Sequence, residues 1–233
     1  MNLFGVGRQS SPFTHEQSQL RLKAVGFAPR VIYDVGAFYG GWTKSARKVF
    51  PAADYFLFEA NADNAPKLEE TGEKFFNAVL SSQDGATKEF YLPKHAVATG
   101  ASLYRENTVY YQSENLRVVP VKTRRLDAFA AEQGLPKPDL IKLDVQGAEL
   151  EVLAGAGDLL ATTGAIVAEL SFLSYNQSAP LIADVIAGID KLGFRSVDIC
   201  EVHRTANGSA LQMDILFANP ALFDKFRAAA GLA

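Results

Sequence analysis

The sequence predicts an α/β domain whose sheet is mostly parallel, with helices on both faces and an antiparallel strand near the C-terminus. Three observations support this fold class. Short β-branched and apolar runs alternate with helical segments, which is the pattern of βαβ units. A glycine-containing turn over 36–41 joins the first strand to the next helix. A hairpin signal over 206–209 separates the last two strands and makes them antiparallel to each other.

The N-terminal half supplies alternating helices and strands. In chain order we expect a helix over 18–25, a strand over 31–35, a helix over 42–50, a strand over 54–58, a helix from 63 to 72 and a strand over 74–80. Gly26 ends the first helix, and Pro51 stops the second. Asp63 caps the third helix, Pro66 follows in its first turn, and Gly72 ends it.

The C-terminal half continues the alternation after a less regular stretch. We expect antiparallel strands over 88–92 and 117–123, a strand over 139–145, a helix over 148–154, a strand over 165–170, a helix over 180–192 and strands over 195–202 and 212–218. The helix over 180–192 is the clearest, because its apolar residues recur at helical spacing and Gly193 stands just beyond its end.

Composition and charge describe an ordinary globular chain. It has 233 residues, of which 48% are hydrophobic and 21% charged, so it can bury a sizeable core. The net charge of −3 argues against a nucleic-acid partner, and the densest basic cluster, Lys122 with Arg124 and Arg125, is interpreted as a solvated strand end. Cys200 is the one cysteine and is expected to be a packed structural thiol.

We divide the chain into a polar N-terminal lead-in over 1–17 and a single domain over 18–233. The N-terminus lacks the charged and apolar regions of a secretory signal, and no apolar run approaches the roughly 18 residues that span a bilayer. We therefore expect a cytoplasmic protein with no membrane partner.

The turn after the first strand is a candidate nucleoside site. Asp34 is the residue before the last of the strand, Gly36 opens the turn, and Glu59 follows at about the spacing at which an acid accepts hydrogen bonds from ribose hydroxyls. A dinucleotide fingerprint would need glycine at position 38, where Phe38 stands. Asp34 also suits a positively charged ligand better than a diphosphate. These residues favour S-adenosylmethionine, which carries a sulfonium group and no phosphate. NAD stays open as the alternative cofactor.

Four motifs resemble the FkbM-type S-adenosylmethionine-dependent methyltransferases. They are Asp34-Val-Gly-Ala-x-x-Gly40, Leu57-Phe-Glu-Ala-Asn61, Arg125-Leu-Asp127 and the segment 139–153, which contains Lys142-Leu-Asp144-Val-Gln-Gly-Ala-Glu149. The resemblance runs from about Gly26 to Asn219. It implies the Rossmann-like class I methyltransferase fold, a seven-stranded sheet with an antiparallel last strand. It also implies O-methyl transfer to a hydroxyl of a sugar or small polar metabolite.

The resemblance also implies which residues bind the cofactor. By match to the family's motifs they are Asp34, Gly36, Ala37, Gly40, Glu59, Ala60, Ala78 and Val79. The first four would line the methionine end of S-adenosylmethionine. Glu59 would hold the ribose, and Ala78 and Val79 would lie near the adenine.

Lys142 and Asp144 are candidate catalytic residues, because residues two apart on a strand project from the same face. A lysine inside a central strand is costly unless it is paired, so a structural ion pair is one interpretation. In the other, Asp144 lies beside the transferable methyl group. There it would orient the acceptor hydroxyl, contact the cofactor's ammonium group or bind a divalent ion.

Further polar residues follow the neighbouring strands. Glu169, Tyr175, Asn176 and Gln212 are expected to bind the substrate, and His203 is the best candidate for a general base. His15 and His95 lie in irregular segments and receive no role. Glu149 is interpreted first as a helix cap.

Two candidate acids, Asp144 and Glu169, are too few to predict a metal site. Three other functions stay open from the sequence. They are an NAD-dependent oxidoreductase, a non-catalytic cofactor-binding protein of the same fold, and a nucleic-acid methyltransferase, against which the negative net charge weighs.

Overall fold

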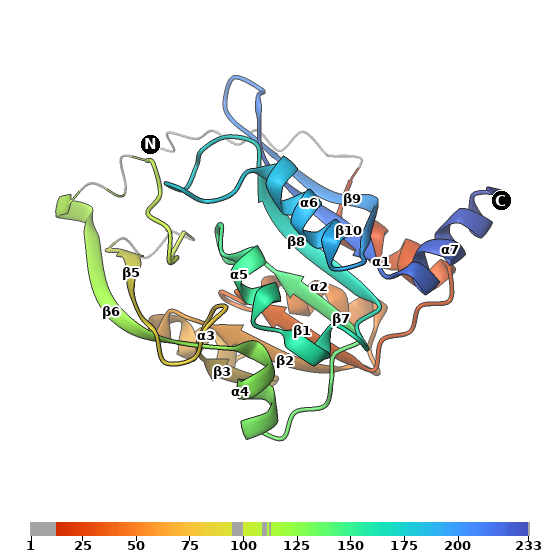
Figure 1. The fold of residues 1–233 in the computed structure, drawn as a ribbon, viewed down its shortest axis with the longest axis horizontal. Helices are drawn as coiled ribbons and strands as arrows, with labels where there is room; N and C mark the ends of the chain where they lie inside the picture. The colour runs from red at the N-terminus through yellow and green to blue at the C-terminus, as the bar shows by residue number, and fades with distance from the viewer. Residues whose placement is uncertain (1–12, 95–99, 109–110, 112, 233) are drawn as a thin grey trace.

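The structure is a computed structural model that describes residues 13–94, 100–108, 111 and 113–232 (Figure 1). The predictions made for residues 1–12 and for His95 lie outside these ranges. The helices and strands are α1 (His15–Ala24), β1 (Val31–Val35), α2 (Gly41–Val49), β2 (Asp54–Glu59), α3 (Ala65–Glu69), β3 (Lys74–Asn77), β4 (Val79–Leu80), β5 (Thr87–Pro93), β6 (Leu116–Arg124), α4 (Leu126–Glu132), β7 (Leu140–Leu143), α5 (Glu149–Ala154), β8 (Ala165–Ser171), α6 (Ile182–Lys191), β9 (Arg195–Arg204), β10 (Ala210–Ala218) and α7 (Pro220–Ala229).

A seven-stranded sheet forms the centre of the molecule, in the order β3-β2-β1-β7-β8-β10-β9. The strands from β3 to β8 pair in parallel, whereas β10 is antiparallel to both β8 and β9. The predicted mostly parallel sheet with an antiparallel last strand is therefore confirmed. In the register of β10, Gln212 pairs with Ser171 of β8 and with His203 of β9. The start of β10 thus meets the carboxyl ends of its neighbours at one edge of the sheet.

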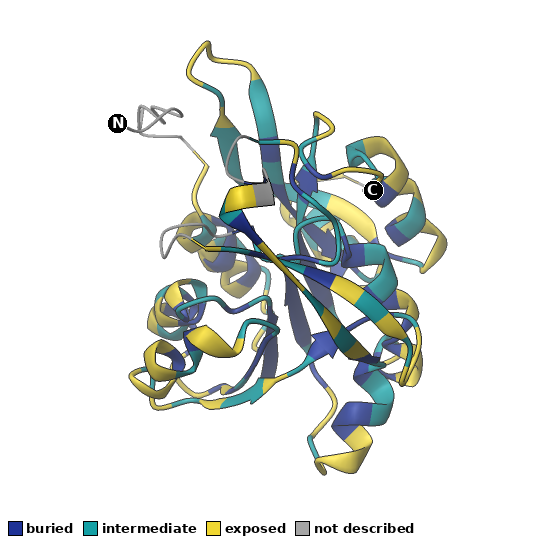
Figure 2. Cartoon of the chain, turned by 90° about the vertical axis from the view of Figure 1, so that its left-hand side faces the viewer, coloured by how far each residue is buried: buried dark blue, intermediate teal, exposed yellow. Residues whose placement is uncertain are grey.

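Helices cover both faces of this sheet, because alternate residues of each strand point to opposite sides. Tyr33 of β1 packs in a core with residues of α4, α5 and α6, whereas the adjacent Ile32 packs in a second core with residues of α1, α2 and α7. The central strands are accordingly buried along their length, while the helices keep exposed outer faces (Figure 2).

A smaller sheet of β4, β6 and β5 lies beside the large one, at the left of Figure 1. The antiparallel pairing of β5 with β6 agrees with the expected strands over 88–92 and 117–123. The single strand expected over 74–80 is wrong, because the chain changes sheets at Ala78. β3 pairs with β2, and β4 pairs with β6. Asn77 is the last residue of β3, and its side-chain amide donates to the carbonyls of Glu59 and Ala60.

Several boundaries also differ from those expected. α1 begins at His15 and not at residue 18, because the Thr14 hydroxyl caps it by accepting from the backbone N–H of Gln17. β9 extends through His203 to Arg204. The sequence analysis missed α4 and α7 altogether. Within the described residues, the helices are all too short or too polar to cross a membrane.

Candidate active site

A cavity of about 840 Å³ opens at the edge of the sheet where β1, β2, β7 and β8 end. Residues after these strands line it, together with residues of α1, β9, β10 and the segment 101–103. Its size falls within the range typical of sites for small molecules. The cavity lies where open α/β sheets bind ligands, beyond the carboxyl ends of the strands.

The turn after β1 is built for close contact between backbone and ligand. Gly36 has φ +75°, and a Cβ atom there would lie 1.8 Å from the carbonyl oxygen of Asp144. Only glycine fits this position without displacing the end of β7. The Glu59 carboxylate fastens the turn, because Oε2 accepts from the backbone N–H of Phe38 at 2.7 Å and Oε1 from that of Asn61 at 2.8 Å. Burial raises the pKa of Glu59.

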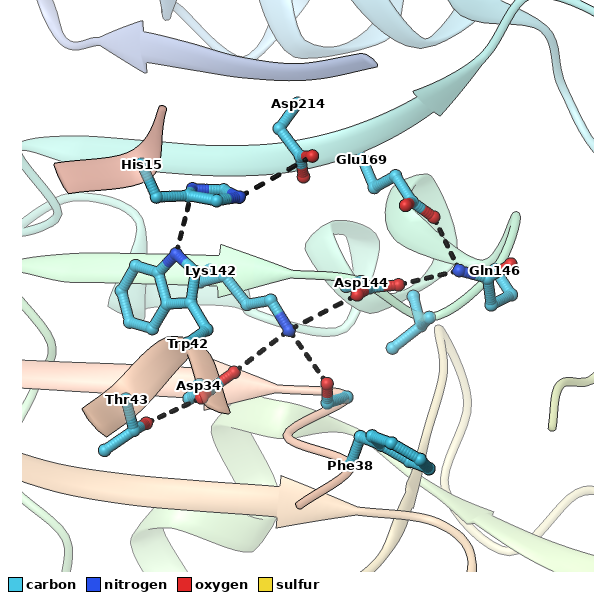
Figure 3. Close-up of polar contacts among 12 residues, drawn as sticks. His15, Asp34, Phe38, Trp42, Thr43, Lys142, Asp144, Gln146, Glu169 and Asp214 are labelled. Atoms are coloured by element: carbon cyan, nitrogen blue, oxygen red, sulfur yellow. Dashed lines mark hydrogen bonds and ion pairs between the residues drawn. The ribbon is translucent and has the colours of Figure 1, made fainter. Parts of the chain in front are cut away.

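The side chain of Lys142, from β7, contacts the same turn (Figure 3). Its Nζ lies 3.1 Å from Oδ1 of Asp34, donates to the carbonyl of Gly36 at 2.8 Å and lies 3.7 Å from Oδ2 of Asp144. Thr43 donates to the other oxygen of Asp34 at 2.6 Å. Burial alone would lower the pKa of Lys142, but Asp34 and Asp144 outweigh it and raise this pKa. The ion pair is therefore a charged, internal part of the fold.

The predicted cofactor residues fall into two groups. Those that line the cavity are Gly36, Ala37, Glu59, Ala60 and Val79. Asp34, Gly40 and Ala78 are not among the lining residues. Asp34 is fully buried beneath the turn, and Gly40 caps α2 with φ +72° against the side chain of Thr71. Ala78 packs against the core.

Carboxylates converge on the opposite side of the cavity and are separated by amides (Figure 3). Nε2 of Gln146 donates to Asp144 at 2.8 Å and to Glu169 at 2.5 Å. Nε2 of Gln212 donates to the same Glu169 oxygen at 2.8 Å. Burial, followed by the charges of Asp144 and Asp214, raises the pKa of Glu169 well above its usual range. Gln146 was not predicted as a site residue, although it stands directly after Val145 in the motif that begins at Lys142.

Two histidines meet one carboxylate in the same cavity. Nε2 of His203 lies 3.3 Å from Oδ2 of Asp214, and Nε2 of His15 lies 3.6 Å from the same oxygen. The hydrogen bond with Asp214 raises the pKa of His203. His15 was expected in an irregular segment, but it begins α1, which brings it to the cavity wall. No local pattern could have indicated this contact, which joins the start of the domain to its last strand.

The remaining predicted residues differ in their exposure to the cavity. Tyr175 lines the cavity, whereas Asn176 is buried behind it and donates to the carbonyl of Tyr104 at 3.3 Å. Glu149 begins α5 and accepts from the backbone N–H groups of Val145 and Gly147, as expected of a cap. Burial raises the pKa of Glu149 to about 7.

Two overlapping groups of side chains come close enough to hold a metal ion. One comprises His15, Glu201 and Asp214, and the other Glu169, His203 and Asp214. The indole N–H of Trp42 donates to Nδ1 of His15, so Nε2 carries the proton of the neutral ring and has no lone pair for a metal. In the second group, the hydrogen bond between His203 and Asp214 accounts for the short distance without an ion.

Comparisons with known proteins agree with this geometry. Residues 34–196 match the family described as the methyltransferase FkbM domain. The 2-O-methyltransferase NoeI of Sinorhizobium fredii is 30% identical over 157 residues, which cover 60% of this chain and 63% of that protein. The hexuronic acid methyltransferase AglP of Haloferax volcanii is 26% identical over 144 residues, 60% of this chain and 55% of that protein. The chain thus matches less than two thirds of either relative's length.

A solved structure shares the fold. A ribosomal protein methylase from Lactobacillus delbrueckii subsp. bulgaricus superimposes with a TM-score of 0.50 at 10% identity, over 88% of this chain and 77% of the other. Together with the strand order, this likeness identifies the class I methyltransferase fold. The family match covers most of the chain, from the end of β1 to the start of β9. The chain therefore belongs to the FkbM methyltransferase domain family.

Proposed function

We propose that this protein transfers a methyl group from S-adenosylmethionine to a hydroxyl group of a sugar or a similar polar metabolite. The observation that carries the proposal is the turn after β1. Glycine is the one residue type that fits at Gly36, and Glu59 faces the cavity beside it. The names of the two relatives support a saccharide acceptor, since one is a 2-O-methyltransferase and the other a hexuronic acid methyltransferase.

The charge of the cavity supports this cofactor over a dinucleotide. Its acidic lining residues are Glu16, Glu59, Asp144, Glu169, Glu201 and Asp214. Lys142 and Arg204 are the only lysine and arginine among the described lining residues, and Lys142 is already paired with Asp34. Such a lining suits a ligand with sulfonium and ammonium groups and repels a diphosphate. When bound, S-adenosylmethionine supplies a methyl group on a positively charged sulfur atom.

Glu59 is positioned to bind the ribose of this cofactor. Each of its oxygens already accepts one backbone N–H, which holds the carboxylate still and leaves further lone pairs for two hydroxyl groups. Ala60 and Val79 line the cavity beyond it and are suited to contact the adenine. Gly36 and Ala37 would lie along the methionine part.

The acceptor would bind between the end of β7 and the start of β10. Asp144 is proposed to orient the acceptor hydroxyl, and Glu169, Tyr175 and Gln212 to hold the rest of the molecule. His203 is proposed to take the hydroxyl proton as the oxygen attacks the methyl carbon and the carbon–sulfur bond breaks. The protein would thus contribute positioning and the removal of one proton.

The proposal is tested by incubating the purified protein with methyl-labelled S-adenosylmethionine and a panel of sugars, uronic acids and glycosides. We expect label in an alkali-stable ether, which is the product of O-methylation. Label in an alkali-labile ester would indicate transfer to a carboxylate instead. Binding of NADH without binding of S-adenosylhomocysteine would identify an oxidoreductase. Binding of S-adenosylhomocysteine without transfer to any acceptor of the panel would favour the non-catalytic alternative.

A further inference from the structure

The carboxylate of Asp214 lies between two histidines that come from distant parts of the chain. His203 belongs to β9, and His15 is the first residue of α1. Both present Nε2 to Oδ2 of Asp214, at 3.3 Å and 3.6 Å respectively. Asp214 is buried in β10, away from water. The two histidine rings therefore lie close to a carboxylate that solvent stabilises little. How the two rings share this charge depends on where their protons lie.

The position of the proton on His15 follows from Trp42 (Figure 3). Nε1 of Trp42 lies 3.1 Å from Nδ1 of His15. An indole nitrogen donates and does not accept, so Nδ1 of His15 must be the acceptor. A proton on Nδ1 would face the indole N–H directly. In the neutral ring the proton therefore lies on Nε2, which points at Asp214 and at Glu201, whose Oε2 is 3.5 Å away.

The position of the proton on His203 follows from Asp214. Burial would raise the pKa of Asp214, but its interactions with His15 and His203 outweigh burial and hold this pKa well below its usual range. Asp214 is therefore ionised and can only accept hydrogen bonds. Nε2 of His203 must then be the donor in their 3.3 Å contact. This leaves Nδ1 of the neutral ring with the lone pair.

We propose that His15 and Trp42 are positioning residues for proton transfer, which act through Asp214 on His203. Trp42 directs the Nε2 proton of His15 at Asp214, so His15 supports the charge of Asp214 with an N–H group. Asp214 in turn holds His203 with Nε2 protonated and Nδ1 free to accept the acceptor's proton. This inference rests on the proposed function, and it adds a catalytic purpose for α1 that the family motifs do not include.

The fold keeps α1 fixed for this purpose. Leu22 packs in the core shared with α2 and α7, and Arg21 forms an ion pair with Asp198 of β9 at 2.6 Å. The buried thiol of Cys200 contacts the hydroxyl of Ser18 at 3.3 Å. These contacts lie along the helix beyond His15, so its ring is held at the cavity by a docked helix and not by a loose segment.

The surroundings of His203 set the sign of the expected effects. Its acidic neighbours are Glu169 of β8, at 3.8 Å, Glu201 of β9, Asp214 of β10 and, at longer range, Asp144 after β7. Asp214, Glu201 and Asp144 raise the pKa of His203, and a positive charge on His15 would lower it. Trp42→Phe removes the indole N–H and lets His15 take a second proton, so it should lower the pKa of His203.

The test is nitrogen-15 NMR of the protein labelled at its three histidines, as a function of pH and with S-adenosylhomocysteine present. His15→Gln and His203→Gln assign the signals. In the wild type we expect both rings in the Nε2–H form when neutral. In Trp42→Phe we expect His15 to populate the Nδ1–H form and the pKa of His203 to fall by about half a pH unit or more.

His15→Gln is the matched control, because an amide can donate to Asp214 but stays neutral. The pKa of His203 should stay near the wild-type value both in His15→Gln and in the double variant His15→Gln with Trp42→Phe. The acid limb of the pH profile of kcat/KM should follow the pKa of His203 in each variant. We expect Trp42→Phe to lower kcat about threefold or more, and His15→Gln to restore it.

Three results would overturn the inference. One is a wild-type His15 with its proton on Nδ1. Another is a Trp42→Phe protein whose histidine signals match those of the wild type. The third is a pH profile that does not move when the pKa of His203 does. Failure of the wild-type protein to bind S-adenosylhomocysteine would instead count against the proposed function. The two failures can be told apart, because the histidine tautomers are observed without turnover.

Discussion

Lys142 and Asp34 form a buried ion pair directly beneath the turn that faces the cavity. Their charged atoms are 3.1 Å apart, on the adjacent parallel strands β7 and β1. Lys142 also donates to the carbonyl of Gly36, so the pair fixes the backbone of the turn from inside the protein. The interpretation of Lys142 as part of a structural ion pair thus has an observed partner, and the pair also shapes the turn that lines the cavity.

Lys142→Met should destabilise the protein by about 3 kcal/mol or more, because it leaves the charge of Asp34 buried without its partner. Urea unfolding followed by circular dichroism measures this loss. The double variant Asp34→Asn with Lys142→Met should recover part of the stability, since it removes the stranded charge. The two residues do not act as a pair if the double variant loses as much free energy of unfolding as the two single variants together, or more.

Gly36→Ala should abolish binding of S-adenosylhomocysteine, because its Cβ would collide with the carbonyl of Asp144. Gly26→Ala is the matched control. Gly26 has nearly the same backbone angle, φ +77°, but no atom of the described residues lies within 4 Å of the place where its Cβ would stand. It should cost only the strain of a left-handed residue, about 1–2 kcal/mol, and keep the cofactor site. Equal losses of ligand affinity in the two variants would contradict the close-approach argument.

Glu149 should make the fold less stable as the pH rises. Burial raises its pKa to about 7 in the folded protein, against an ordinary value near 4.5. Between these values the folded protein holds a proton that the unfolded chain has released, so stability falls with increasing pH. The contribution is about 3 kcal/mol between pH 4.5 and 7.5.

Glu149→Gln should remove this contribution, since its carbonyl oxygen can still accept from Val145 and Gly147. Urea unfolding at pH 5 and at pH 8 measures how the free energy of unfolding changes with pH in the variant and in the wild type. Glu69→Gln, on the exposed end of α3, serves as the control and should keep the wild-type slope. A wild-type slope in Glu149→Gln would show that the carboxyl of Glu149 is ionised at neutral pH.

His203→Gln should separate catalysis from cofactor binding. Removal of a general base costs about a hundredfold or more in kcat. His203 and Glu59 line the same cavity, but only Glu59 lies on the side proposed for the cofactor, so the affinity for S-adenosylhomocysteine should change by less than about twofold. Single-turnover transfer and calorimetry give the two quantities. An unchanged kcat would remove His203 from the proton transfer.

The parts of the fold that were predicted are those with local signals. The β1–turn–α2 unit, the acid at the end of β2 and the C-terminal hairpin each depend on residues close together in sequence. The break at Ala78 was not predicted, because an apolar run from 74 to 80 fits one strand as well as two. Only the competition between two sheets for that run decides the outcome.

The parts of the site that were missed depend on distant contacts. His15 sits in a polar helix whose sequence gives no sign of a cavity, and it meets Asp214 only because α1 docks against β9. Asp34, which was expected beside the cofactor, pairs with Lys142 through the register of β1 with β7 and is not among the lining residues. Side-chain partners across a sheet follow from register, which the sequence alone does not specify.

Calorimetric titration with S-adenosylhomocysteine shows whether the turn after β1 and Glu59 bind the cofactor, as we propose. We expect micromolar binding to the wild-type protein and a loss of at least about 30-fold in Glu59→Ala, the cost of roughly two hydrogen bonds to the ribose. A folded wild-type protein that does not bind, with or without a sugar acceptor, would contradict this proposal. So would equal affinity in Glu59→Ala.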